Sequence, residues 1–215
     1  MTGPTSPHAG QPVLRDGMPP AQARAAVIMI HGRGAGPANI MELVSAIGHP
    51  HAAYLAPAAA GGTWYPQSFM APIAQNEPGI SSGISVIHGL IDEVIGAGIP
   101  AERIMLLGFS QGACLACTAA QRRPDRYGGV MAFSGGLIGP PGTTWSEHGV
   151  FRSTPVFFGC SDRDAHVPES RVRESAAVLE RMGALVTTRI YPGMGHLVND
   201  DEIAFARESL IQLAT

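Results

Sequence analysis

The sequence lacks an apolar run of 18 residues, the length that a membrane-spanning helix needs. Its first 25 residues carry proline, glycine and polar residues where a signal peptide would have an apolar core. Basic residues number 14 in 215 and form no run, and the net charge is −3, which argues against a nucleic-acid partner. We therefore expect a cytoplasmic protein with no stable membrane insertion.

Cysteine is also scarce. The three cysteines, an odd number, fit a reducing compartment. Cys114 and Cys117 form a C-x-x-C pair, but they lie among alanines in a predicted helix, and no second pair completes a zinc site. We expect both to be small core residues, and the protein to work without metal or cofactor.

With 215 residues, of which 45% are apolar, the chain can bury the core of one globular domain. The Pro-rich residues 1–24 predict a loosely ordered arm, and 25–215 the domain. Apolar runs predict strands at 26–30, 52–57, 103–107, 128–134, 154–160 and 185–192. Helical patterns lie near 39–47, 80–97, 111–122, 168–182 and 200–213. This alternation predicts an α/β fold, a mostly parallel sheet with helices on both faces and its site at the carboxyl ends of the strands.

The pattern G-x-S-x-G, the turn that can present a nucleophilic serine, occurs twice, at Gly79–Gly83 and Gly108–Gly112. Only the second copy has a buried strand before it and an Ala-rich helix after it, so Ser110 is the candidate nucleophile. The first copy follows a polar, Pro-containing stretch, where Ser81 or Ser82 is expected to cap a helix.

Further reactive groups follow other predicted strands. Asp162 and Asp164 follow one strand and His196 follows the next, which gives the order Ser…Asp…His of α/β-hydrolases. Histidine can take the serine proton and later return it, and a carboxylate fixes its tautomer. His196 is the expected base, because the other histidines lie in the arm, in a predicted helix, upstream of the serine, in a loop before the strand of the acid, or too close to the acid.

The sequence leaves two candidates for the carboxylate that orients the histidine. Asp162 lies three residues after Gly159 at the predicted strand end, and Asp164 lies four before Pro168. We favour Asp162, because a position measured from a strand is more rigid than one measured across a loop, and keep Asp164 as the alternative.

Two backbone amides are expected to stabilise a developing oxyanion. One is the N–H of Gln111, directly after the nucleophile, and the other is the N–H of Arg33 in the glycine-flanked loop that follows the first strand. His31 opens that loop and is expected to brace it, whereas His166 is expected to line the substrate pocket.

From about Ala25 to the C-terminus, the chain resembles the small carboxylesterase/phospholipase-like α/β-hydrolases, which include acyl-protein thioesterases. The resemblance rests on "HGRG", "TWYP", "GFSQGACLA", "RRPDRYGGVMAFSGGL", "HVP" and "YPGMGH". It implies a serine esterase with a triad at Ser110, an aspartate in 162–164 and His196, and with oxyanion donors at Arg33 and Gln111. One departure is "GCSDRDAHVP", which reads as two residues longer than the family's G-x-x-D-x-x-V-P when counted from Gly159.

No segment offers room for a large cap domain, because only about 20 residues connect the strands that end near Ser134 and begin near Thr154. The other long connection, 58–79, is expected to line the acyl pocket. Its apolar side chains are Trp64, Tyr65, Phe69 and Met70. The alternative is that these side chains only pin the loop to the body of the domain.

The sequence thus predicts hydrolysis of small, uncharged carboxylic esters through an acyl-serine intermediate. A thioesterase or lysophospholipase would use the same groups on another leaving group, and a non-catalytic binding module could keep the same fold. The expected partner is a small-molecule ester, and homodimer formation stays open.

Overall fold

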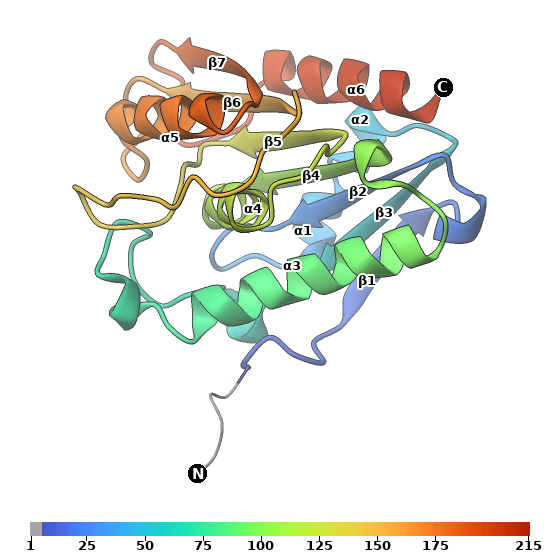
Figure 1. The fold of residues 1–215 in the computed structure, drawn as a ribbon, viewed down its shortest axis with the longest axis horizontal. Coiled ribbons are helices and arrows are strands. Elements are labelled where there is room, and N and C mark those ends of the chain that lie inside the picture. Colours follow the sequence, from blue (N-terminus) through green and yellow to red (C-terminus); the bar gives the residue numbers. More distant parts are fainter. Residues whose placement is uncertain (1–5) are drawn as a thin grey trace.

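The computed structural model of the chain describes residues 6–215, which form a seven-stranded sheet with helices on both faces (Figure 1). The strands are β1 (Val13–Gly17), β2 (Ala25–Ile30), β3 (Ala52–Pro57), β4 (Ile104–Phe109), β5 (Gly129–Phe133), β6 (Pro155–Ser161) and β7 (Leu185–Tyr191). The α-helices are α1 (Pro37–Met41), α2 (Val44–Ile47), α3 (Gly79–Gly96), α4 (Gln111–Arg122), α5 (Glu169–Arg181) and α6 (Asp200–Ala214). Short 3-10 helices cover Pro20–Gln22, Ala60–Gly62, Ile73–Gln75 and Ala101–Arg103.

The strands lie in the order β1-β3-β2-β4-β5-β6-β7, so β4 is at the centre. All pairs are parallel except β1 with β3. The strands from β4 to β7 therefore end at one edge of the sheet. This edge is where an open α/β sheet places its site.

Both faces of the sheet are covered, which explains why the central strands are continuous apolar runs. In β2, Ala26 and Ile28 belong to the core on the side of α3, α4 and α5, whereas Val27 and Met29 belong to the core on the side of α1, α2 and α6. All four side chains are fully buried. The residues between β5 and β6 (134–154) contain neither helix nor strand. The predicted α/β-hydrolase architecture without a large cap domain is confirmed.

The segment expected to be a loose arm differs from that prediction. Residues 13–17 form β1, which pairs antiparallel with β3 and places Leu14 opposite Ala56 and Asp16 opposite Tyr54. Most of β1 is exposed, as is common for a short edge strand. It therefore has little of the hydrophobic pattern by which strands are predicted. Residues 1–5 of the expected arm lie outside the described residues.

The helix expected near 39–47 is divided into α1 and α2. It begins earlier, at Pro37, because proline is well suited to the first position of a helix. The backbone N–H of Leu43 bonds to the Ile40 carbonyl three residues back, which tightens the chain between the two short helices.

Candidate active site

The tight turn between β4 and α4 carries Ser110. Its φ of 55° and ψ of −118° are uncommon for a residue with a side chain, and its N–H bonds to the Phe133 carbonyl at 2.9 Å. A Cβ atom at Gly108 would collide with the backbone of Gly112, and one at Gly112 with the carbonyl of Ile30. The two glycines of the pentapeptide therefore permit the close approach of strand and helix that this turn requires.

Three side chains from three strand ends form one hydrogen-bonded chain. His196 Nε2 lies 2.8 Å from Ser110 Oγ, and His196 Nδ1 lies 2.7 Å from Asp164 Oδ2. The Asp164 side chain is fully buried, whereas that of His196 is 20% exposed. An ionised carboxylate only accepts hydrogen bonds, so Nδ1 carries the proton and Nε2 accepts from the serine hydroxyl. This arrangement readies the hydroxyl to transfer its proton as it attacks.

The structure contradicts the preference for Asp162 as the acid beside His196. Asp162 Oδ1 instead accepts a hydrogen bond from the N–H of Gly193, at 2.7 Å. The carboxylate in contact with the imidazole belongs to Asp164, which was the alternative.

The preference failed because the position of the acid was counted from the wrong landmark. β6 continues to Ser161, two residues past Gly159, so the turn begins later than predicted. Counted back from Val167 and Pro168, the spacing D-x-x-V-P indicates Asp164 with no insertion. The glycine position of the family pattern then falls on Ser161. This count was the signal in the sequence that could have identified the aspartate in contact with His196.

The turn after β6 holds Asp164 as an anion. Burial alone would raise the pKa of this carboxyl, but hydrogen bonds from His196 and from the backbone N–H groups of His166 and Val167 lower it below its ordinary value. The two amides donate to Oδ1 at 2.8 and 3.0 Å. The thiol of Cys160 lies 3.8 Å from Oδ2. The carboxylate is thus fixed from several sides before it orients the imidazole.

The two amides expected to hold an oxyanion are those of Gln111 and Arg33. Gln111 is the first residue of α4, where the N–H has no partner within the helix. Within residues 6–215, neither this N–H nor that of Arg33 donates to another group of the chain. Both residues line the same cavity as Ser110. This arrangement is consistent with the predicted donors.

His31 braces the loop that contains Arg33, as expected. Its Nε2 accepts from the N–H of Ala59 at 3.1 Å, so Nδ1 carries the proton and donates to the Gly32 carbonyl at 2.8 Å. Burial lowers the pKa of His31, which keeps the ring neutral. The side chain of Trp64 donates to the His31 carbonyl at 3.0 Å and completes this brace.

The side chain of Gln111 has a further role that sequence reasoning did not identify. Its oxygen accepts from the N–H of Trp64, and its amide nitrogen donates to the carbonyl of Tyr65, both at 2.8 Å. The Arg33 guanidinium bonds to the carbonyls of Pro66 and Gln67 in the same connection. The residues that offer the two free amides therefore also anchor the loop expected to line the pocket.

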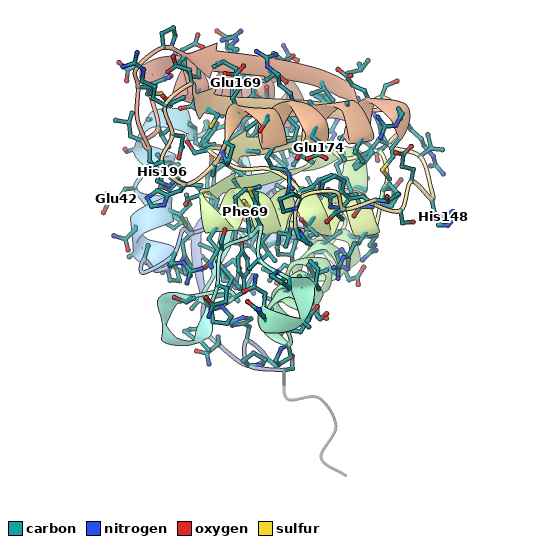
Figure 2. All side chains as sticks on the ribbon, turned by 90° about the vertical axis from the view of Figure 1, so that its left-hand side faces the viewer. Glu42, Phe69, His148, Glu169, Glu174 and His196 are labelled. Carbon is teal, nitrogen blue, oxygen red and sulfur yellow. The ribbon has the colours of Figure 1, made fainter. Side chains whose placement is uncertain are left out.

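A cavity of about 570 Å³ opens beside Ser110. Of the predicted pocket residues, Tyr65, Phe69 and His166 line it. In Figure 2, His196 and Phe69 lie near each other on one face, whereas His148 lies at its far end. Trp64 and Met70 are not among the lining residues; Trp64 is fully buried and packs between the rings of two histidines, and Met70 packs against the core. For these two, the alternative that they pin the loop agrees with the structure.

Other parts of the pocket come from elements that sequence reasoning did not connect with it. Ile40, Leu43 and Val198 contribute apolar side chains, and the ring of Phe109 packs against that of His196 with centroids 5.0 Å apart. His8 was set aside as part of the arm, yet it is buried, and its Nε2 lies 2.8 Å from the Trp64 carbonyl. No sequence pattern marks these residues, because only the folded chain brings them together.

No helix of residues 6–215 is both long and apolar enough to cross a membrane. The same residues contain no cluster of three or more histidine, cysteine or acidic side chains with the arrangement of a metal site. All three cysteines are free and buried.

Comparisons with known proteins agree with this geometry. Residues 17–214 match the family described as phospholipase/carboxylesterase. The crystal structure of a phospholipase/carboxylesterase from Dyadobacter fermentans is similar, with 40% identity, a TM-score of 0.89 and coverage of 94% of this chain and 97% of that one. Acyl-protein thioesterase 1 of Eremothecium gossypii is 34% identical over 61% of this chain, which spans 58% of that relative's length. A probable carboxylesterase of Oryza sativa subsp. japonica is 29% identical over 89% of this chain and 78% of its own length. The chain belongs to the phospholipase/carboxylesterase family of α/β-hydrolases.

Proposed function

We propose that this protein is a carboxylesterase that hydrolyses small, uncharged carboxylic esters through an acyl-serine intermediate. The observation that carries the proposal is the unbroken chain of hydrogen bonds from Ser110 through His196 to Asp164, at 2.8 and 2.7 Å. These three side chains lie at the N-terminus of α4, beside two free backbone amides and a cavity large enough for a small acyl group.

In acylation, Ser110 Oγ attacks the ester carbonyl while its proton passes to His196 Nε2. Asp164 stabilises the imidazolium that forms and keeps Nδ1 protonated. The carbonyl oxygen becomes an oxyanion, which the N–H groups of Arg33 and Gln111 stabilise; one such donor typically contributes about 10²–10³-fold in rate. His196 then gives its proton to the leaving alkoxide, so that the alcohol departs and the acyl-serine remains.

Deacylation repeats these steps with water as the nucleophile. His196 takes a proton from the attacking water, the same amides hold the second oxyanion, and the imidazolium returns a proton to Ser110 Oγ as the acid is released. Every proton in the cycle therefore passes through His196 Nε2. All these groups belong to side chains and amides of this chain.

The cavity supports an apolar, uncharged acyl group. Its lining includes Ile40, Leu43, Phe69, Phe109 and Val198. No carboxylate of residues 6–215 lines it, and the guanidinium of Arg33, its one permanently charged group, bonds to the carbonyls of Pro66 and Gln67. The mainly apolar walls provide a hydrophobic contribution to binding but little bonding capacity for a charged substrate. We propose a small-molecule ester as substrate and the cytoplasm as location; three buried free cysteines suit a reducing compartment.

The test is a panel of p-nitrophenyl esters of increasing acyl length, together with matched oxyester and thioester pairs that share one acyl group. The proposal predicts higher kcat/KM on oxyesters and a preference for short acyl chains. A consistent preference for thioesters would favour the second candidate, an acyl thioesterase, which the thioesterase relatives support. No turnover of any pair, together with failure of a fluorophosphonate to label Ser110, would leave only a binding role.

A further inference from the structure

The loop that carries His196 consists of residues 192–198, between β7 and α6. Gly193 and Gly195 in this loop adopt φ values of +68° and +79°, in the left-handed region. Glycine reaches this region without strain, but it also leaves the backbone free to adopt many other conformations. The position of the imidazole therefore depends on groups outside the loop that hold these two residues.

Two consecutive residues at the end of β6 supply those groups. Asp162 Oδ1 accepts from the N–H of Gly193 at 2.7 Å, and Ser161 Oγ accepts from the N–H of Gly195 at 3.0 Å. The N–H of Asp162 also bonds to the Tyr191 carbonyl at 3.3 Å, which extends the pairing of β6 with β7 to the start of the loop. The loop is thus bonded to the end of β6 at Gly193, three residues before His196, and at Gly195, directly before His196.

The hydroxyl of Ser161 is well placed for this contact. The residue is fully buried at the last position of β6. Its Oγ also accepts from the N–H of Arg163 at 3.1 Å and lies 3.4 Å from Asp162 Oδ1, to which the hydroxyl donates. The hydroxyl therefore links the turn that contains Asp164 to the loop that contains His196.

We propose that Ser161 and Asp162 are positioning residues, which hold the loop of His196 in register with Asp164 through the amides of Gly195 and Gly193. The inference rests on the proposed function, because it concerns the base of that reaction. Ser161 stands where the family pattern G-x-x-D-x-x-V-P has glycine, which has no hydroxyl to accept from Gly195. Neither residue touches the reacting atoms; both act on the geometry between Ser110 and His196.

Substitutions at Asp162 separate the bond from the charge. Asp162→Ala removes the acceptor for Gly193, and we expect kcat to fall about 10- to 100-fold with KM within about twofold, since a displacement of about 1 Å can have such an effect. Asp162→Asn retains an oxygen that can accept the same bond, so kcat should stay within about fivefold of the unsubstituted protein. This rescue by the isosteric amide would not be expected if the negative charge were what mattered.

The matched control is Asp16→Ala at the opposite edge of the sheet. Asp16 Oδ1 accepts from the N–H of Gly17 at 2.7 Å, the same bond type and length as at Asp162. It lies on β1, far from β6 in the strand order. Its loss should leave kcat within about twofold, since it is remote from the site. An equal fall in kcat for Asp16→Ala and Asp162→Ala would overturn the proposal.

Ser161→Ala and Ser161→Gly give a second, independent arm. Each removes the acceptor for Gly195, so we expect a fall in kcat of about 10-fold with little change in KM. Should Asp162→Ala fail to fold, which circular dichroism and the unfolding midpoint would reveal, the Ser161 variants carry the test. Values of kcat within twofold of the unsubstituted protein for both variants would overturn the proposal.

A readout that does not require turnover distinguishes this proposal from the proposed function. The proton on His196 Nδ1 that bonds to Asp164 should give a downfield proton NMR signal, assigned by its absence in His196→Gln. The signal should persist in Asp162→Asn and Asp16→Ala, and broaden or vanish in Asp162→Ala and Ser161→Ala. If no ester is hydrolysed but the signal follows this pattern, the positioning role stands and the proposed function fails; an unchanged signal in both alanine variants contradicts the positioning role.

Discussion

The pentapeptide G-x-S-x-G occurs twice in this chain, and the two copies adopt different structures. In Gly108–Gly112, Ser110 lies at a strand-to-helix turn with φ 55° and its hydroxyl faces an imidazole. In Gly79–Gly83, Ser81 lies in the first turn of α3, exposed, and its hydroxyl donates to the carboxylate of Glu77 at 2.8 Å. The same five-residue pattern thus yields a strained turn in one place and ordinary helix in the other.

The difference arises from what precedes each copy. The buried central strand β4 directly precedes the second copy, so Ser110 lies at the edge of the sheet where other strands also end. The first copy follows Pro78, with no strand before it. Even the expected cap there is wrong, because Glu77 accepts from the N–H of Ser81 and performs the capping role assigned to Ser81 or Ser82. The chemistry of the pattern is therefore set by the surrounding fold.

The largest expected difference between the two copies is the effect of replacing each serine by alanine. Ser110→Ala removes the nucleophile, and we expect kcat to fall at least about 10⁵-fold. Ser81→Ala removes only an exposed contact with Glu77 and should leave kcat within about twofold. The measurement is initial rates on one p-nitrophenyl ester for both purified variants. Comparable losses in the two variants would contradict the distinction between the copies.

The two aspartates after β6 provide a second comparison, between one carboxylate that contacts His196 and one that does not. Asp164→Asn should favour the wrong imidazole tautomer and lower kcat by about 10⁴-fold, whereas Asp162→Asn keeps its contact with Gly193 and should cost less than about fivefold. Steady-state rates for both variants on one ester provide the check. A larger loss at Asp162 than at Asp164 would restore the original preference for Asp162.

Two aromatic residues of the 58–79 connection form a third pair. Phe69→Ala enlarges the cavity and should shift the preference among p-nitrophenyl esters toward longer acyl chains. Trp64→Ala removes a fully buried side chain outside the cavity lining, so it should lower the free energy of unfolding by about 3–5 kcal/mol with little change in that preference. The checks are chain-length profiles and urea unfolding. A profile altered by Trp64→Ala but not by Phe69→Ala would contradict these roles.

The last comparison concerns the pH dependence of stability and two carboxylates, Glu202 and Glu77, that accept from backbone amides near the start of a helix. Glu202 is buried in the first turn of α6, accepts from the N–H of Asn199 at 2.9 Å, and burial raises its pKa to about 7. Because the folded pKa lies above the unfolded value, this group stabilises the fold fully below about pH 4.5, and the contribution of about 3 kcal/mol is lost as pH rises through about 7.

Urea unfolding between pH 5 and pH 8 tests this effect. Stability of the unsubstituted protein should fall across this range, and Glu202→Gln, which cannot ionise, should remove that part of the fall. Glu77→Gln, at the partly exposed start of α3, is the matched control and should keep the slope. Equal slopes for all three proteins would show that Glu202 is not the group responsible.

Much of the fold could be predicted because burial on both faces leaves a clear mark on the sequence. β2, β3 and β4 are continuous apolar runs, and the helix 111–122 was predicted with the bounds that the structure has. β1 could not be predicted in this way, since four of its five residues are exposed and its pairing with β3 comes from distant parts of the chain. Edge strands lack the hydrophobic pattern on which such predictions depend.

The site was predictable to the extent that it depends on strand ends. Ser110 follows β4 directly and His196 lies in the loop that follows β7, and the structure brings both together. The acid depended on where β6 ends, and element boundaries are the least reliable part of such predictions. Trp64 was assigned to the pocket from its apolar character alone, which does not distinguish a cavity wall from a core anchor.

The central claim is that Ser110 is the residue that becomes acylated. The most direct measurement is to label the protein with a fluorophosphonate and to locate the adduct by mass spectrometry of its peptides. We predict one adduct per chain, on the peptide that contains Ser110, and none after Asp164→Asn at short labelling times. An adduct on the peptide that contains Ser81, or a protein that stays unlabelled while folded, would contradict the account.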